Sequence, residues 1–159
     1  MGCDIHPFAE VRRDGAWHVN TAKVFPNAYA DCGAEPFTDK PFDWRGYGMF
    51  GLLAGIRDGD IVPISEPRGL PDDVSPEVDK ALNGPSLRST DFWSDPGLHS
   101  YSWLTLAELQ AVDPDRPFNG KLGGEPLRDY LGEGFFDQVT ALAQLGNPED
   151  VRVVFAFDS

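Results

Sequence analysis

Three residues that can bind a metal ion or a charged ligand lie close together near the start of the sequence: Cys3, Asp4 and His6. Side chains two apart on a β-strand point to the same face, so Asp4 and His6 could hold one ion between them. With His99, or with Cys3, they would complete a divalent-metal site of oxygen, nitrogen and sulfur ligands. The alternative is structural: His6 is hydrogen-bonded to Asp4 and fixes the start of the chain.

A second group of reactive side chains is the run His99-Ser100-Tyr101-Ser102-Trp103. On a strand, His99, Tyr101 and Trp103 share one face and the two serines share the other. A histidine beside a serine can act as a base beside a nucleophile, and His99 is such a histidine. If the protein is an enzyme, His6 and His99 are the candidate catalytic residues for acid–base chemistry. Neither serine is framed by the glycines of a nucleophile elbow. The alternative is an edge strand whose serines face water.

Three arginines lie in settings that suit anion binding: Arg45, Arg57 and Arg68. The first two flank a glycine-bearing apolar stretch, and Arg68 lies in a rigid Pro-Arg-Gly turn, where a guanidinium can clasp a phosphate with two parallel bonds. Trp44, Tyr47, Trp93 and Trp103 are candidates for stacking on a base. The expected ligand-binding set is Arg45, Tyr47, Arg57, Arg68, Ser100, Ser102 and Trp103. The alternative is that the arginines pair with the abundant carboxylates and the aromatic rings belong to the core.

Two strands joined by a tight turn begin the chain, because Asp14-Gly15 separates the strand-like runs 5–11 and 16–19. The run 151–158 is apolar on both faces, which is typical of a central, covered strand. The initial hairpin and this final strand are natural neighbours. We therefore expect Arg152 or Asp158 to lie near the first strand.

Apolar spacing and capping residues predict several short helices between these strands. The first covers residues 44–59, with Asp43 as its N-cap, and its glycines indicate that another backbone or a ligand comes close. Further helices are expected from Ser75-Pro76 to Gly84, from the capping box Thr105–Glu108 to Val112, and, as one interrupted helix or two, over 125–145. Loops at 22–43 and 85–98 and a short edge strand over 61–64 complete the pattern. It predicts an α+β fold: a small antiparallel or mixed sheet packed with several short helices.

The composition predicts one domain over residues 1–159, since a chain of this length with 41% apolar residues can bury a sizeable core. The net charge of −13 argues against DNA or RNA as a partner, because binding to phosphate backbones depends on clustered Lys and Arg. The sequence carries no secretory signal and no apolar stretch long enough to cross a membrane. We therefore expect a cytoplasmic protein whose Cys3 and Cys32 are free thiols.

Several blocks of this sequence together resemble a family of small, uncharacterised proteins of tailed phages and prophages. The blocks are Met1-Gly2-Cys3-Asp4-Ile5-His6, Trp44-Arg45-Gly46-Tyr47 with the helix that follows, Pro67-Arg68-Gly69-Leu70-Pro71, His99 to Leu104, and Phe155-Ala156-Phe157-Asp158. The family has no assigned activity to carry over. The resemblance implies a compact, virus-encoded accessory protein in the cytoplasm of a host bacterial cell. By analogy with other phage proteins, it would bind or destroy nucleotide signals of bacterial immunity.

Three functions remain open from the sequence. The first is sequestration of a small phosphorylated nucleotide, such as a cyclic dinucleotide, by the ligand-binding set. The second is hydrolysis of such a signal by a phosphodiesterase that uses a metal at Asp4, His6 and His99, or histidine acid–base chemistry. The third is an acidic inhibitor of another protein, and a homo-oligomer is left open throughout. The first two require His6, the three arginines and Trp103 to border one common cavity.

Overall fold

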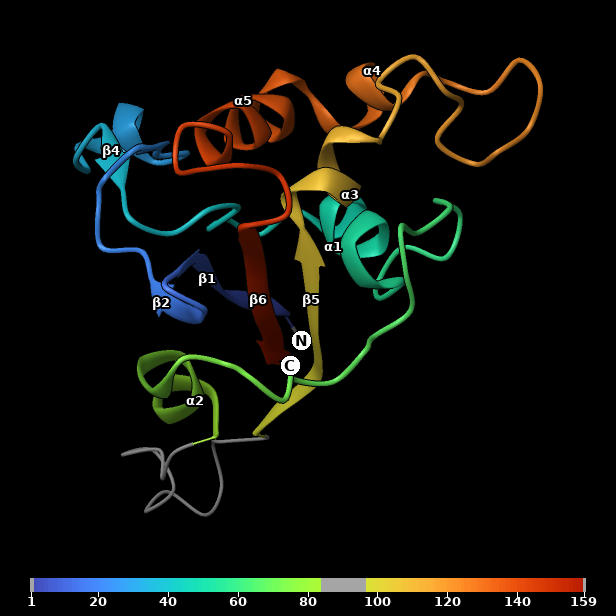
Figure 1. Ribbon diagram of the computed structural model, residues 1–159. Coiled ribbons are helices and arrows are strands. Elements are labelled where there is room, and N and C mark those ends of the chain that lie inside the picture. Colours follow the sequence, from blue (N-terminus) through green and yellow to red (C-terminus); the bar gives the residue numbers. More distant parts are fainter. Residues whose placement is uncertain (1, 84–96, 159) are drawn as a thin grey trace.

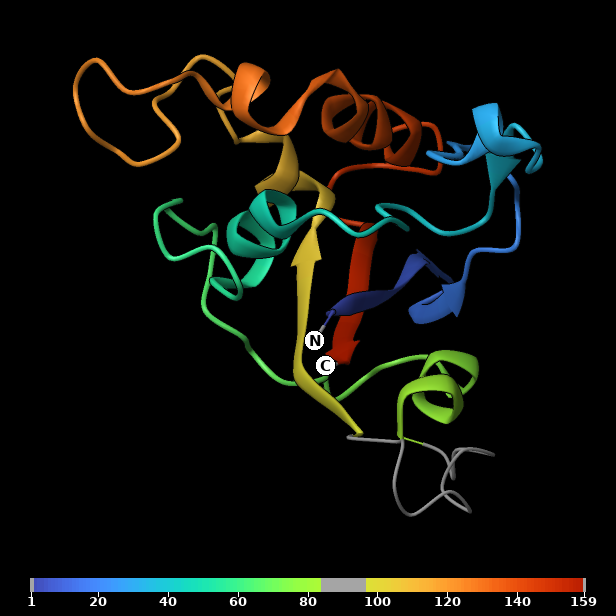
Figure 2. The ribbon, with the colours of Figure 1, turned by 180° about the vertical axis from the view of Figure 1, so that it is seen from behind.

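The fold is α+β, as the sequence predicts, and the computed structural model describes residues 2–83 and 97–158. A four-stranded antiparallel sheet forms its centre, and a two-stranded sheet lies to one side (Figure 1). Five helices in the described ranges surround the larger sheet, and Figure 2 shows the same arrangement from behind. None of the helices described is long and apolar enough to cross a membrane.

The larger sheet has the strand order β2-β1-β6-β5. Its strands are β1 (Asp4–Arg13), β2 (Ala16–Val19), β5 (Leu98–Thr105) and β6 (Val151–Asp158). The predicted hairpin is confirmed, because β1 pairs with β2 across a turn in which Asp14 and Gly15 both have positive φ, 53° and 79°. Positive φ at both central residues is typical of the tight turns that match the twist of a hairpin.

The predicted central position of the last strand is also confirmed. β6 pairs with β1 on one side and with β5 on the other, and its residues 151–157 are all buried. The register with β1 runs from Asp4 opposite Asp158 to Val11 opposite Val151. Both expected neighbours of the first strand therefore lie beside it, Asp158 at one end of β6 and Arg152, opposite Glu10, at the other.

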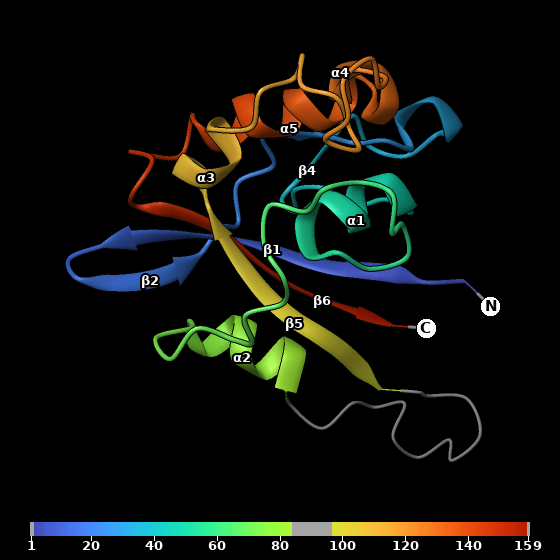
Figure 3. The ribbon, with the colours of Figure 1, turned by 90° about the vertical axis from the view of Figure 1, so that its right-hand side faces the viewer.

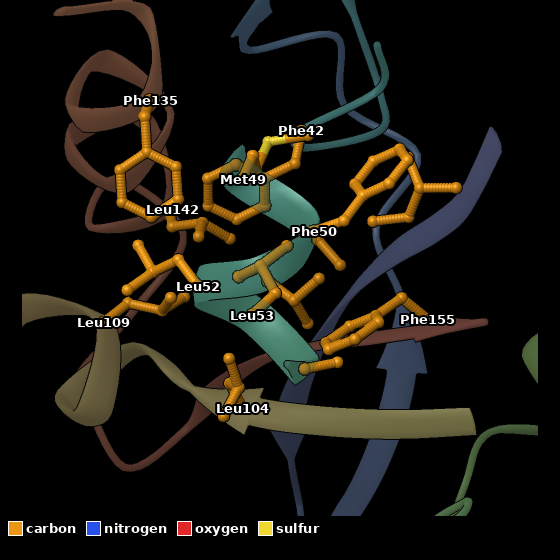
Figure 4. Packing of buried hydrophobic residues seen from close by; sticks show 14 of the residues in the cluster. Phe42, Met49, Phe50, Leu52, Leu53, Leu104, Leu109, Phe135, Leu142 and Phe155 are labelled. Carbon is orange, nitrogen blue, oxygen red and sulfur yellow. The ribbon is translucent and has the colours of Figure 1, made fainter. Parts of the chain in front are cut away.

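Helices cover the two faces of the sheet unequally (Figure 3). One face carries α1 (Tyr47–Ala54), α3 (Leu106–Gln110), α4 (Leu127–Leu131) and α5 (Glu133–Leu142). The other face carries α2 (Pro76–Asn83), whose Val78 and Leu82 pack on Val154 and Ala156 of β6. The larger core lies under α1, where Phe50, Leu52 and Leu53 meet side chains of β5, β6 and α5 (Figure 4).

Helix α1 is half as long as the predicted helix over 44–59, and its cap differs. It begins after Gly46 rather than Asp43, and it ends at Gly55, whose left-handed φ of 70° reverses the chain. Its glycines predict that another backbone or a ligand comes close, and the structure shows that the loop from Asp58 to Ile61 does so. A Cβ on Gly51 would lie 2.3 Å from Cγ2 of Ile61 and 2.8 Å from the Asp58 carbonyl oxygen. A longer helix would displace this loop.

The remaining predictions of helices, strands and loops are partly confirmed. The capping box of Thr105 and Glu108 is confirmed at the start of α3, and the region 125–145 forms two helices, α4 and α5. The edge strand expected over 61–64 is wrong, since those residues form no strand. The loop 22–43 holds the small sheet, β3 (Phe25–Pro26) and β4 (Phe37–Thr38), and a 3-10 turn at Ala30–Cys32. The predicted stop at Gly84 and the loop 85–96 with Trp93 lie outside the described residues.

Candidate functional site

The residues predicted to share one cavity are divided between the two ends of the central sheet. His6 and Asp4 lie beside Asp158 at the end of β6, whereas Arg68 and Trp103 line a cavity together with Arg152 near its beginning. His6 lies opposite Ala156, four positions or about 13 Å along β6 from Arg152. The lining of the cavity that holds Arg68 and Trp103 includes neither His6 nor Arg45 nor Arg57. The prediction that these groups converge on one cavity is therefore wrong.

At the first end, four side chains form what we call the terminal cluster: Asp4, His6, Arg45 and Asp158. Nε and Nη2 of Arg45 donate to the two carboxylate oxygens of Asp4 at 2.9 and 3.0 Å. Nε2 of His6 lies 2.7 Å from Oδ2 of Asp158, so the partner of this histidine is Asp158 rather than Asp4. The hydrogen bond from Arg45 lowers the pKa of Asp4. Arg45 thus pairs with a carboxylate, which is the alternative given for the arginines in the sequence analysis.

Tyr47 lies next to the terminal cluster and holds the start of the chain, and Arg57 packs on its ring. The backbone N–H of Cys3 donates to the Tyr47 hydroxyl at 3.3 Å, and the Arg57 guanidinium lies 5.4 Å from the centre of the Tyr47 ring. The guanidinium of Arg45 packs so closely on Gly2 that a Cβ there would lie 2.6 Å from it. Two of the predicted ligand-binding residues, Arg45 and Tyr47, therefore anchor the N-terminal segment.

The predicted metal site is not assembled. Within residues 2–83 and 97–158, no three His, Cys, Asp or Glu side chains are grouped so that they could hold a metal ion. His6 pairs with Ala156, and His99 pairs with the next residue, Phe157, so the two histidines project from opposite faces of the sheet. Cys3 is buried, and Cys32 is exposed as a free thiol.

A β-bulge in β5 changes which residues of the run 99–103 share a face. The pairing with β6 slips between His99 and Ser102, and Ser100 adopts a left-handed φ of 56°. The slip places His99 on the face of Ser102 and away from Trp103, so the expected His99, Tyr101 and Trp103 face is wrong. Ser102 is fully buried, and its hydroxyl accepts the Arg68 N–H at 3.0 Å. Nδ1 of His99 lies 3.0 Å from the Ser100 hydroxyl.

The second end of the sheet holds a cavity of about 630 Å³, which we call the indole cavity. It lies on the face of the sheet that carries α2. Two tryptophans line it, Trp17 from β2 and Trp103 from β5, together with the guanidiniums of Arg12, Arg68 and Arg152. Of the predicted ligand-binding set, only Arg68 and Trp103 line this cavity.

The wall around Trp17 is fixed by a buried ion pair. Nε of Arg152 donates to Glu10 at 2.7 Å, and both side chains are almost completely buried. The same guanidinium lies 3.9 Å from the centre of the Trp17 ring and donates to Asp73 at 2.9 Å. The indole N–H of Trp17 also donates to Asp73, and the backbone N–H of Ser75 donates to Glu10. These bonds hold Trp17 in one orientation and lower the pKa of Asp73.

The wall around Trp103 is built by the turn that contains Arg68. The guanidinium of Arg68 lies 4.8 Å from the centre of the Trp103 ring and donates to the Trp103 carbonyl oxygen at 3.1 Å. It also pairs with Glu108, which together with the capping box lowers the pKa of that carboxyl to about 2. The N–H of Gly69 donates to the Tyr101 carbonyl oxygen, so the turn is fixed along the edge of β5.

Arg12 differs from the other two arginines because part of its guanidinium is free. Nε donates to Asp150 and Nη2 to the Glu149 carbonyl oxygen, at 2.9 and 3.1 Å. Nη1 has no hydrogen-bond partner among the residues that the structure describes. The side chain is 41% exposed, so this nitrogen can donate to an anion in the cavity.

Among the lining residues that the sequence did not single out as ligand-binding, three carry the site's rings and charges: Arg12, Trp17 and Arg152. Two signals could have found them. The hairpin register places Arg12 directly opposite Trp17, and Arg152 is a charged residue in a strand that is otherwise apolar up to Asp158. A charged side chain in a central strand needs partners that compensate its burial, and the partners of Arg152 form the wall of the indole cavity around Trp17.

We compared the chain with protein-family models, with curated proteins and with solved structures, and found no match in any of the three.

Proposed function

We propose that the protein binds a small phosphorylated nucleotide in the indole cavity and retains it without cleaving it. The observation that carries the proposal is that two tryptophans and three guanidiniums border one cavity of about 630 Å³. Pockets for small molecules commonly span about 300–1,000 Å³, with apolar walls and a few fixed polar groups. Aromatic walls suit a flat base, and guanidiniums suit a phosphate.

The phosphate would bind at Arg12, and the base would stack at Trp103. Nη1 of Arg12 needs no existing bond to break before it donates, unlike the fully engaged Nε and Nη1 of Arg68. Stacking of a base on an aromatic ring contributes about 1–3 kcal/mol. Asp72 and Asp73, which also line the cavity, offer carboxylate oxygens to the amino group of a base.

The charges of the lining favour a nucleotide with few negative charges. The three arginines are matched by three carboxylates in the lining, Asp72, Asp73 and Glu149. A lining with no formal net charge gives no general attraction for a polyanion in a protein of net charge −13. We therefore propose a cyclic or monophosphate nucleotide, or a cyclic dinucleotide, in preference to a triphosphate.

Retention without hydrolysis follows from the position of the histidines. A histidine must come within about 3 Å of the reacting group, or reach it through one water, to transfer a proton. His6 lies opposite Ala156, about 13 Å along the strand from Arg152, and does not line the indole cavity. His99 projects from the opposite face of the sheet, so neither histidine is placed beside a ligand in this cavity. With the resemblance to phage accessory proteins, we propose that sequestration of a nucleotide signal in the cytoplasm of a host bacterial cell is the biological role.

Isothermal titration calorimetry with 3′,5′-cyclic AMP, cyclic di-AMP and ATP tests this proposal. We expect at least one cyclic nucleotide to bind more tightly than ATP. Arg12→Gln should weaken that binding about tenfold, because it removes the free guanidinium donor. Arg13→Gln is the matched control, since Arg13 is the exposed next residue of β1, outside the cavity.

Two further readouts separate the other functions. Chromatography of the ligand released by heat should recover it intact, and hydrolysis products lost in His6→Ala would instead support the phosphodiesterase. An absence of binding by every nucleotide, with no change in Tm, would overturn the proposal and leave the acidic inhibitor as the alternative.

A further inference from the structure

A second, smaller cavity lies beside the terminal cluster and is independent of the proposed nucleotide site. It has a volume of about 240 Å³ and lies between the start of β1 and the loop that carries β3 and β4. Its volume is below the range usual for drug-sized ligands. The cavity therefore suits one small chemical group rather than a base, a sugar and a phosphate together.

The walls of this cavity combine aromatic rings with carboxylates. Tyr29 and Trp44 contribute the rings, and Asp4 and Asp43 contribute the acids. The Tyr29 side chain remains 48% exposed at the cavity, although it is large and partly apolar. Aromatic faces together with a carboxylate are the usual surroundings of an organic ammonium group, whose positive charge is attracted by the ring faces.

Asp4 and Asp43 differ in whether a positively charged side chain is already paired with the carboxylate. Both oxygens of Asp4 accept from Arg45, whose guanidinium packs on Gly2 and does not line the cavity. Asp43 accepts no hydrogen bond and forms no ion pair in the described part of the chain, and the ammonium of Lys40 lies over the Phe8 ring at 5.6 Å. Desolvation raises the pKa of Asp43 by more than the positive charges of Lys40 and His6 lower it.

We propose that this cavity binds an organic ammonium group, with Trp44 and Tyr29 against its carbon atoms and Asp43 as its counter-ion. A divalent metal fits less well, because no group of three metal-ligating side chains is present in the described ranges. The ammonium group can belong to a free amine or to a lysine side chain of another protein. Both sources present one positive charge next to carbon atoms, so both suit an aromatic wall with a carboxylate.

The test compares choline with its neutral analogue 3,3-dimethyl-1-butanol, by titration followed in two-dimensional NMR of the Trp44 indole N–H. We expect choline to bind with a dissociation constant on the order of 1 mM and the neutral analogue to bind about tenfold more weakly. The third arm uses lysine with an acetylated α-amino group and an amidated carboxyl group, so that the ε-ammonium of the side chain keeps its charge. If it binds more tightly than choline, the source is a lysine side chain, and if more weakly, a free amine.

Two variants assign the binding to this cavity. Asp43→Asn should weaken choline binding about tenfold. Trp44→Phe should weaken it less, because a smaller ring remains; this variant has no Trp44 indole, so its titration is followed by the backbone N–H signals of Ala34 and Thr38 in the cavity lining. Asp31→Asn is the control, since Asp31 is an exposed acid of the nearby 3-10 turn that does not line the cavity. Equal binding of the neutral analogue, an equal loss in Asp31→Asn, or no binding of any of the three probes would overturn the proposal.

Discussion

The two ends of β6 use the same kinds of side chains in opposite environments. Near its start, Arg152 and Glu10 form an ion pair that solvent barely reaches, with side chains 4% and 0% exposed. At its end, His6 and Asp158 form a pair whose side chains are 36% and 24% exposed. A buried pair cannot exchange its partner for water, whereas an exposed pair can. The buried end is therefore suited to hold the wall of a binding site, and the open end to exchange contacts.

The largest effect should come from breaking the buried pair. Glu10→Gln removes the charge opposite Arg152 and leaves a buried guanidinium without its main counter-charge. Loss of one partner of a buried ion pair costs about 3–5 kcal/mol in the free energy of unfolding. Urea denaturation followed by circular dichroism measures the loss. A loss below about 1 kcal/mol would mean that water reaches this pair, and the contrast between the two ends would fail.

A smaller effect is expected at Arg68 and Glu108, which are partly exposed, with side chains 27% and 31% accessible. The pKa of Glu108 is lowered from 4.5 to about 2, so its carboxylate stabilises the folded state fully above pH 4.5. That contribution, about 1 kcal/mol after allowance for solvent screening, is lost as the pH falls from 4.5 towards 2.

Glu108→Gln tests this pH dependence, because glutamine keeps the capping box and removes only the charge. The free energy of unfolding of the variant should be below that of the wild-type protein at pH 6, and the difference should shrink as the pH approaches 2. A difference that stays constant over this range would contradict the assignment of the low pKa to the pair with Arg68.

The smallest effect is expected at the open end. Asp158→Asn keeps the shape of the side chain and removes its charge next to His6. Exposed pairs of this kind contribute at most about 1 kcal/mol, so the free energy of unfolding should fall by less than this amount. A loss as large as that of Glu10→Gln would show that the open end is as important for stability as the buried end.

Local signals in the sequence predict most of the framework correctly. The Asp14-Gly15 turn, the apolar last strand and the capping box at Thr105 each depend on residues close together in the chain, and all three are confirmed. The length of α1 was not predictable in the same way. Gly55 ends the helix because the loop from Asp58 to Ile61 packs on Gly51, and this contact is tertiary.

The candidate site was harder to predict, because one slip in the pairing of β5 with β6 determines which side chains of residues 99–103 share a face. The bulge at Ser100 places His99 on the opposite face from Trp103, and the spacing of residues in the sequence does not predict this bulge. The sequence correctly singled out Arg68 and Trp103 as lying together, but it grouped them with residues of the terminal cluster. The partners of Arg152 come from three separate segments, β1, β2 and the stretch before α2, which only the fold brings together.

The central claim is that the nucleotide occupies the cavity between Trp17 and Trp103. It is tested most directly by two-dimensional NMR of the indole N–H groups, assigned with single Trp→Phe variants, during titration with the tightest-binding cyclic nucleotide. If the nucleotide binds there, the Trp17 and Trp103 signals will shift together along one saturating curve while the Trp44 signal stays in place. Saturable shifts confined to Trp44, or binding that moves neither Trp17 nor Trp103, would contradict it.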